Sequence, residues 1–385
     1  MEILFPRFEL MNIVLIGNYP GDRQQSMTRY AAFLYRELTR RGHNVRLITP
    51  AVRVRSLLPH RHRLGKWLGY VDKYILFRFG FSRSIHGAEL VHVCDHSNSP
   101  YLAWVKGKPT IITAHDAFAI RSALGHYAPN PTGASGRKLQ QWILSSLAYA
   151  DRIVYVSDKT RADFTHTLSI STPSDVILHA LNWSYGPAGE EQLQHTLTTL
   201  GLVRGGYLLH VGGNNWYKNR PGVLFAFAEI QKQDRFRDFK LVMAGKPMTK
   251  AMRDWIRKSS LSGVISLEDV TNEQLQALYS GAAALLFPSL EEGFGWPLLE
   301  AQACGCPVIT SGREPMMQVA GLGAVYMDPE EPSTAVGALD EVMARREELI
   351  AAGSQNLKRF TVEEVIDRYE AAYRRLLESF GTAAS

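Results

Sequence analysis

The feature that most constrains the fold of this chain is a repeated alternation of short apolar runs with helical patterns. The run NIVLIG at residues 12–17 is followed by an amphipathic segment at residues 27–41 and by the run NVRLITP at residues 44–50. Short apolar runs of this kind are typical of buried parallel strands. The order of the three segments predicts a strand–helix–strand unit.

The alternation continues through the first half of the chain and then restarts. Further apolar runs of the first half are at residues 90–93, 110–113, 153–156 and 176–178. A second series begins with GGYLLHVGGNN at residues 205–215 and a helical pattern from about Pro221. Its later apolar runs are at residues 239–243, 282–287 and 307–310. The two series predict an α/β fold with two Rossmann-like, doubly wound domains that face a cleft.

The length of 385 residues also favours two domains, because it exceeds what one hydrophobic core usually supports. We expect an N-terminal domain over residues 11–190 and a C-terminal domain over residues 203–358, with a polar linker region at residues 186–206. An amphipathic helix at residues 359–380 is expected to pack back on the N-terminal domain. A second methionine, Met11, precedes the first apolar run, so residues 1–10 are expected to lie outside the fold.

Composition narrows the class of protein. Apolar residues make up 45% of the chain and charged residues 21%, as in ordinary globular proteins. No apolar run reaches the roughly 18 residues that a membrane-spanning helix needs. Three cysteines without ligand spacing favour a reducing, cytoplasmic location. The net charge of +6 fits nucleotides, anionic lipid or nucleic acid and does not choose among them.

The stretch FPSLEEGFGWPLLEAQACGCPVIT at residues 287–310 carries the most chemical information. Its order indicates a strand, a glycine turn, a short helix and a further strand. Gly293 and Gly295 permit close backbone approach to a ligand, and the helix start offers N–H groups to an anion such as a diphosphate. Glu292 and Glu300 are spaced to bind vicinal hydroxyls on two separate rings. Two glutamates alone would more often be a loop carboxylate and a solvated helix carboxylate.

This stretch, together with HVGGNNWYKNRPGVL at residues 210–224, resembles the signature of family 4 retaining glycosyltransferases of the GT-B fold. The resemblance implies that Glu292 contacts the donor sugar, that Glu300 contacts the ribose of the nucleotide, and that Lys218 contacts the donor phosphates. A fixed cation there would stabilise charge on the leaving diphosphate. Other donor contacts implied by the resemblance are at Gly213, Asn214, Gly293, Phe294 and Gly295.

Two departures from the family pattern bear on this site. Many relatives carry an arginine where Gly213 stands, and Arg220 is then the candidate for the second cation. Relatives often carry a glutamate where Gln318 stands, which removes one acidic contact.

The first half carries a candidate catalytic histidine. In PTIITAHDAFAI at residues 109–120, His115 and Asp116 follow an apolar run and are expected at the carboxyl end of a buried strand. Alone, they would more often be a strand-end histidine and a turn aspartate. The resemblance places His115 near the donor sugar, and Gly17, after the first strand, against the donor. Ser26 and Met27 replace the paired glycines that relatives usually carry before the first helix.

Several aspects of mechanism are also expectations at this stage. The chain has no Asp-X-Asp motif at a diphosphate site, so we expect no metal and no cofactor, with Lys218 and helix N-termini in that role. No carboxylate stands out as a covalent nucleophile. The resemblance implies retention of configuration through a same-face substitution in which the leaving phosphate helps to deprotonate the acceptor.

The segment from Arg53 to Arg83 is basic and aromatic, with Asp72 as its one acid. Its other basic residues are Arg55, Arg61, Arg63, Lys66, Lys73 and Arg78. This composition fits a peripheral membrane contact near a polyprenyl-linked acceptor, stacking on single-stranded nucleic acid, or an ordinary helix pair with a solvated face. We favour the membrane among the two binding interpretations and expect no nucleic-acid partner.

The predicted function is transfer of a hexose from a UDP- or GDP-linked sugar to a glycan or lipid-linked acceptor in polysaccharide assembly. A nicotinamide oxidoreductase is disfavoured because GNYPGD at residues 17–22 lacks the glycine spacing of a dinucleotide fingerprint. A sugar phosphorylase on the same fold and a non-catalytic nucleotide-sugar-binding protein remain as alternatives.

Overall fold

The computed structural model describes residues 10–22, 24–57, 64–128 and 130–384. Arg61 and Arg63 of the basic segment, and the first nine residues, lie outside these ranges. The chain forms two compact units. The first unit ends at Leu178 and also includes the chain from Val362 onward, whereas the second runs from His179 to Thr361.

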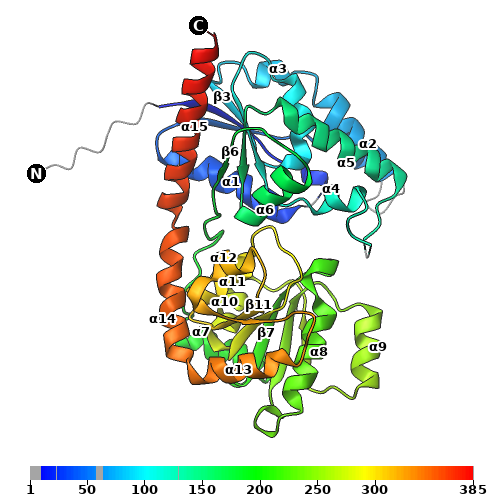
Figure 1. The fold of residues 1–385 in the computed structure, drawn as a ribbon, viewed down its shortest axis with the longest axis vertical. Coiled ribbons are helices and arrows are strands. Elements are labelled where there is room, and N and C mark those ends of the chain that lie inside the picture. Colours follow the sequence, from blue (N-terminus) through cyan, green and yellow to red (C-terminus); the bar gives the residue numbers. More distant parts are fainter. Residues whose placement is uncertain (1–9, 23, 58–63, 129, 385) are drawn as a thin grey trace, which may run out of the picture. The chain divides into compact units, whose positions relative to one another are not determined.

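The first unit contains a six-stranded parallel sheet with helices on its faces (Figure 1). Its strands are β1 (Asn12–Ile16), β2 (Asn44–Ile48), β3 (Leu90–Val93), β4 (Thr110–Ala114), β5 (Arg152–Tyr155) and β6 (Ser174–Val176). Their order is β2-β1-β3-β4-β5-β6. The β3 and β4 strands are buried at every position, and their sequences are apolar except for His92, Thr110 and Thr113.

The helices of the first unit differ in regularity. They are α1 (Gln25–Arg40), α2 (Gly65–Tyr70), α3 (Phe81–Ser84), α4 (Phe118–Ala123), α5 (Ala134–Ser146), α6 (Asp158–Ala162) and α15 (Val362–Ala384). Between α2 and α3 the chain widens into a π-helical turn, η3 (Val71–Leu76). The basic segment therefore folds as a short, broken helical layer whose ring contacts include Phe77 with Phe81 and with Tyr101.

The C-terminal helix α15 is bound to the first unit by buried polar contacts. The Tyr369 hydroxyl lies 2.5 Å from that of Tyr30, and the Tyr373 hydroxyl lies 2.7 Å from His92 Nδ1. Glu370 also meets His43, with Oε1 and Nε2 3.1 Å apart. These contacts lock the helix to α1, to the turn between α1 and β2, and to β3, since a buried polar group without its partner is costly.

The second unit repeats the architecture with a different strand order. Its strands are β7 (Tyr207–Gly212), β8 (Lys240–Gly245), β9 (Val264–Leu267), β10 (Ala284–Phe287), β11 (Val308–Ser311) and β12 (Ala324–Met327). They run parallel in the order β12-β11-β10-β7-β8-β9. The outermost strands, β9 and β12, were not among the apolar runs recognised in the sequence, and β9 has no fully buried residue.

The helices of the second unit surround that sheet (Figure 1). They are α7 (Glu190–Leu200), α8 (Arg220–Gln231), α9 (Lys250–Lys258), α10 (Asn272–Gly281), α11 (Trp296–Ala303), α12 (Met316–Ala320), α13 (Thr334–Ala344) and α14 (Arg346–Leu357). The polar stretch expected to act as a linker forms α7. Leu193 and Leu197 of this helix are buried, so it is part of the second unit.

Candidate functional site

The strand order marks one position at the carboxyl edge of each sheet. In the second unit, β7 pairs with β8 on one side and with β10 on the other. The chain leaves this position in opposite directions, through β8 on one side and through β10 on the other. Open α/β sheets bind ligands in the crevice that such a reversal leaves. The loop after β7 carries Lys218, and the loop after β10 carries Glu292.

Lys218 and Glu292 lie in contact at this crevice. Although they are 74 positions apart, Lys218 Nζ lies 2.7 Å from Glu292 Oε1. The side chains are 17% and 6% exposed, so little water screens the pair. The ammonium also lies 4.9 Å from the centre of the Phe287 ring. The site thus presents a cation and a carboxylate in fixed positions.

The loop after β10 leads directly into α11. Gly295 has a φ of +104°, and a Cβ there would lie 3.1 Å from Leu298 Cδ1, so glycine is required by both conformation and space. The preceding residues are tied to the other loop by the backbone hydrogen bond that Leu290 donates to Tyr217, 2.7 Å long. Phe294 is buried, and with Gly293 it completes the turn that aims the helix start at the crevice.

Glu300 lies one turn into α11 and is buried. One of its oxygens accepts a hydrogen bond of 3.0 Å from the Tyr279 hydroxyl. Burial, reinforced by the charge of Glu300, raises the pKa of Tyr279 well above its ordinary value, so the phenol keeps its proton and donates. Tyr279 therefore orients this carboxylate, a role that sequence reasoning missed.

Arg220, the first residue of α8, is a buried cation beside the loops after β7 and β8. It is 1% exposed, and its Nη1 donates to Asn214 Oδ1 at 2.6 Å and to the Lys246 carbonyl at 2.7 Å. Nε and Nη2 of the guanidinium find no acceptor among the described residues. Burying a cation with unmet N–H groups is costly, so this geometry suits an anionic ligand.

Asn214 and Gly213 flank this cation. The Asn214 side chain accepts from Arg220 and donates to the Pro247 carbonyl at 2.8 Å. Both of its polar groups therefore contact protein atoms, and Asn214 positions Arg220. At Gly213, a Cβ would lie 3.3 Å from Asn215 Oδ1, which leaves little room for the arginine that relatives carry at that position.

His210 is a further buried polar residue at the end of β7. Its Nδ1 lies 3.0 Å from the Leu286 carbonyl, which assigns the proton to that nitrogen. Burial lowers the pKa of His210 to about 3, so the ring is neutral at physiological pH. Its Nε2 has no partner among the described residues. The sequence signal for this residue is a histidine two positions before Gly212, inside the apolar run of residues 205–215.

In the first unit, His115 follows β4 and is buried. Its Nε2 lies 2.8 Å from the Cys94 carbonyl and therefore carries the proton. The ring meets Tyr30 edge-on, with centroids 4.7 Å apart. Burial lowers the pKa of His115, although the charge of Asp95 opposes that effect. The neutral ring thus keeps a lone pair on Nδ1.

Gly17 lies at the end of β1, the equivalent edge of the first sheet. Its N–H donates to the Ile48 carbonyl at 2.9 Å, and a Cβ would lie 3.1 Å from Thr49 Cγ2. Next to it, Asn18 Nδ2 donates to buried Asp95 at 2.6 Å and to Gln24 at 2.5 Å. Sequence reasoning missed Asn18 and Asp95, because neither belongs to a spaced motif.

Among the residues that the structure describes, no three His, Cys, Asp or Glu side chains gather in a way that would hold a metal ion. Likewise, none of the described helices combines the length and apolar character needed to cross a bilayer.

Comparison with known proteins adds two family matches. Residues 27–182 match the model described as Glycosyltransferase Family 4, and residues 204–359 match the model described as Glycosyl transferases group 1. The chain is 28% identical over 249 residues to O-antigen chain mannosyltransferase B of Escherichia coli, covering 62% of this chain. It is 24% identical over 279 residues to a D-inositol 3-phosphate glycosyltransferase of Corynebacterium diphtheriae, covering 69% of this chain. Each match spans 65% of the relative, less than two thirds of its length.

Solved structures resemble the whole chain. Sucrose-phosphate synthase from Thermosynechococcus elongatus superposes with a TM-score of 0.72 at 18% identity, over 95% of this chain and 99% of that one. Anabaena HepE, solved with UDP and glucose, superposes with a TM-score of 0.70 at 15% identity, over 94% and 99% of the chains. At these identities the likeness concerns the fold, and it confirms the prediction of two Rossmann-like domains.

Proposed function

This chain belongs to the family 4 (group 1) glycosyltransferases and has their GT-B fold, and from that premise we propose that it is a retaining hexosyltransferase. It takes a hexose from a UDP- or GDP-linked donor and transfers it to a glycan or polyprenyl-linked acceptor. The observation that carries this proposal is the contact between Lys218 and Glu292 at the β7/β10 crevice, with the buried and incompletely paired Arg220 beside the loop after β7.

Each side chain of this site is assigned to one part of a nucleotide sugar. Lys218 and the two unmet N–H groups of Arg220 face the diphosphate, and they stabilise the negative charge that grows on it as the glycosidic bond breaks. Glu292 accepts hydrogen bonds from hydroxyls of the donor sugar. Glu300, oriented by Tyr279, accepts from the ribose hydroxyls.

The proposed reaction is a substitution at the anomeric carbon. The bond from that carbon to the phosphate oxygen breaks, and the acceptor oxygen bonds to the same face of the sugar. The proton of the acceptor hydroxyl passes to the leaving phosphate, so the products are the glycoside and a nucleoside diphosphate. His115, neutral and held through Nε2, contributes a hydrogen bond near the sugar. In this proposal protein cations and helix N-termini do the work of a metal.

The proposal also includes the pathway in which the protein acts and a contact with the membrane surface. A relative is named as an O-antigen chain mannosyltransferase, which supports a role in polysaccharide assembly. Exposed Trp67, Ile75 and Phe79 lie in the basic segment, and apolar side chains beside cations suit a peripheral contact with anionic lipid. Co-flotation with phosphatidylglycerol vesicles, but not with neutral ones, is the expected result.

A thermal-shift screen with UDP, GDP and their sugars tests the function directly. A nucleotide that binds the folded state raises the melting temperature by mass action. Glu300→Ala should weaken the binding of the selected nucleotide, whereas Lys258→Ala, an exposed lysine on α9, should not. No response to any nucleotide would contradict the proposal.

The two alternatives make distinct predictions in the same assays. A phosphorylase would degrade a disaccharide only when inorganic phosphate is present. A binding protein would show the thermal shift without turnover of any donor. The transferase is favoured over the binding protein because Glu292, Glu300, Lys218 and His115 of the family pattern are all present.

A further inference from the structure

The first unit contains a cavity of about 410 Å³ that no assigned role explains. It opens at the carboxyl edge of the sheet, between the loop after β1 and the segment after β3. Because β1 pairs with β2 on one side and with β3 on the other, this is the crevice position of the first sheet. Its volume falls within the range of about 300–1,000 Å³ that is usual for ligand sites.

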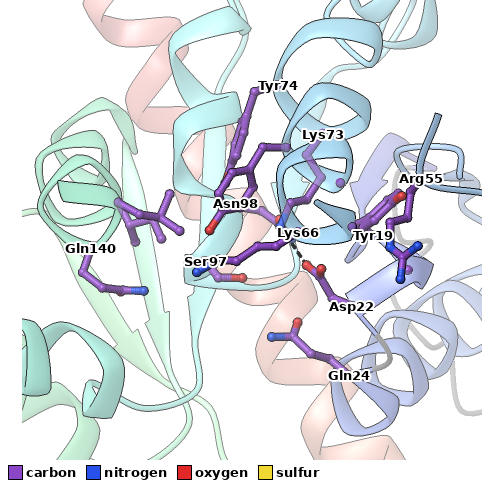
Figure 2. Close-up of a pocket in the computed structure, with 16 residues that line it drawn as sticks. Tyr19, Asp22, Gln24, Arg55, Lys66, Lys73, Tyr74, Ser97, Asn98 and Gln140 are labelled. Carbon is purple, nitrogen blue, oxygen red and sulfur yellow. Dashed lines mark hydrogen bonds and ion pairs between the residues drawn. The ribbon is translucent and has the colours of Figure 1, made fainter. Parts of the chain in front are cut away.

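The lining of this cavity is predominantly cationic. Arg55, Lys66 and Lys73 contribute positive charges, and Asp22 contributes the one carboxylate among the lining residues. Figure 2 shows Arg55 and Tyr19 on one side of the hollow and Ser97 and Gln140 on the other. The amides of Gln24, Asn98 and Gln140 add neutral hydrogen-bonding groups. A lining of this kind suits an anionic group attached to a polyhydroxylated molecule.

The backbone that carries Arg55 is fixed by Asp72. This buried carboxylate accepts hydrogen bonds from the backbone N–H groups of Arg53, Val54 and Arg55, at 3.1, 3.0 and 3.2 Å. It also accepts from the Tyr19 hydroxyl at 2.6 Å. Burial alone would raise the pKa of Asp72, but these hydrogen bonds outweigh it and lower the pKa below its ordinary value. The one acid of the basic segment is therefore a structural anchor.

Two glycines leave space for side chains that line the cavity, Arg55 and Tyr19. A Cβ at Gly65 would lie 2.8 Å from Arg55 Cζ, so the guanidinium occupies space that any other residue would fill. At Gly21, a Cβ would lie 2.4 Å from the Tyr19 ring. A cavity whose cation is seated over a glycine is a prearranged site, in which less ordering cost is incurred on binding.

Lys73 is held in place by aromatic rings. Its ammonium lies 2.8 Å from Asp22 Oδ2 and 5.1 Å from the centre of the Tyr70 ring, with Tyr19 and Tyr74 slightly farther away. These contacts desolvate the cation, which strengthens its attraction for an anion. Lys66, by contrast, is exposed, and its ammonium lies 5.8 Å from the centre of the Tyr70 ring.

We propose that this cavity binds a phosphate group carried by the acceptor. The inference rests on the proposed transferase function, because it assigns the acceptor a chemical class. Planar Arg55 pairs with phosphate oxygens in a bidentate way, and the two lysines supply point charges. The phosphate belongs either to a soluble sugar or polyol phosphate or to a lipid-linked diphosphate, and the two sources share this chemistry.

Equilibrium dialysis of the full chain against radiolabelled inorganic phosphate tests the cavity. Wild type is compared with Arg55→Gln/Lys66→Gln and with Arg83→Gln, which removes an exposed charge of the same segment outside the cavity. The double variant should bind phosphate about ten- to a hundredfold more weakly, and Arg83→Gln should match wild type. Lys218→Gln removes a donor-site cation and should retain phosphate bound in the cavity.

Two further arms separate the sources of phosphate. Wild type is titrated with glucose 6-phosphate and, separately, with phosphatidylcholine vesicles that carry farnesyl diphosphate. Preference for either probe, lost in the double variant, supports the proposal and identifies the source. Equal phosphate binding by the double variant and Arg83→Gln, or no phosphate binding by wild type, overturns it.

A variant that does not fold can be distinguished from one that folds but does not bind phosphate. If the double variant does not fold, Lys66→Gln alone replaces it, because that side chain is exposed and contributes little to the core. Nucleotide binding by wild type is measured in parallel. Its absence would refute the transferase proposal, whereas its presence without cavity-dependent phosphate binding would refute only the phosphate assignment.

Discussion

The two crevices of this molecule arise from the same kind of sheet yet differ in how their charges are held. In the second unit, Lys218 and Glu292 are buried and paired, and Arg220 is fully enclosed. In the first unit, Arg55 and Lys66 line a wider hollow on a broken helical layer. The difference teaches that topology determines where a ligand binds, while the loops determine its chemistry. This division would suit an enzyme whose donor is common to its family and whose acceptor is particular to one protein.

The largest effect should come from the charge pair of the second crevice. Lys218→Ala removes the cation that we propose faces the leaving diphosphate, and we expect kcat to fall by about 10²–10³, with a smaller loss of nucleotide affinity. Steady-state transfer and calorimetric titration with the nucleotide measure the two quantities. Lys258→Ala is the control. Equal turnover by Lys218→Ala and Lys258→Ala would mean that the charge pair of the second crevice does not contribute to the reaction.

That pair illustrates what the sequence was able to predict. The strands before both loops are short apolar runs, and parallel strands bring their carboxyl ends to one edge, so the pattern placed both loops at that edge, whereas it did not predict the contact between Lys218 and Glu292. The edge strand β9 was missed because none of its residues is fully buried and because its sequence, VISL, is too short to show a clear periodicity. Family resemblance, meanwhile, supplied the roles assigned to Glu292 and Glu300, which spacing alone would have left ambiguous.

Other features could not be derived from local sequence. Arg220 opens a helix, where a charged residue is usually solvated, and only the fold encloses it beneath Asn214 and Lys246. Asp72 resembled a lone acid in a basic surface, yet it accepts three backbone hydrogen bonds from residues 17–19 positions earlier. Both cases depend on tertiary contacts, which periodicity does not encode.

Arg220→Met should separate binding from stability. The substitution removes a buried cation with two unmet N–H groups, and replacing such a group with an apolar one is often neutral or stabilising. We expect nucleotide affinity to fall about ten- to a hundredfold while the melting temperature stays equal or rises. A large loss of stability with unchanged affinity would make Arg220 a structural residue and weaken the contrast.

Acid should destabilise both units through their neutral histidines. Burial, aided by His115, lowers the pKa of His92 to about 3, and burial lowers that of His210 likewise to about 3. The unfolded chain takes up these protons near pH 6.5. Stability is therefore complete above that pH and falls towards pH 3, by about 1.4 kcal/mol per pH unit for each histidine.

Urea unfolding between pH 7 and pH 4 measures this slope for each variant. His92→Gln should flatten it for the first unit and His210→Gln for the second, whereas the exposed His86 and His195 serve as controls. An unchanged slope in either buried-histidine variant would contradict the prediction for that unit.

The smallest effect, and the finest test of the comparison, concerns Gly65. An alanine there would place a Cβ 2.8 Å from Arg55 Cζ and displace the guanidinium, so phosphate binding in the first crevice should weaken by a few-fold. Gly337→Ala is the matched control, because Gly337 lies inside α13 with nothing near its added Cβ, and it should raise stability by about 0.4–1 kcal/mol. Since glycine loosens any helix, Gly65→Ala should gain part of the same stability while losing ligand. If Gly65→Ala gains stability without losing phosphate affinity, then Arg55 moves aside at no cost. The lysines would in that case determine which anions the first crevice binds.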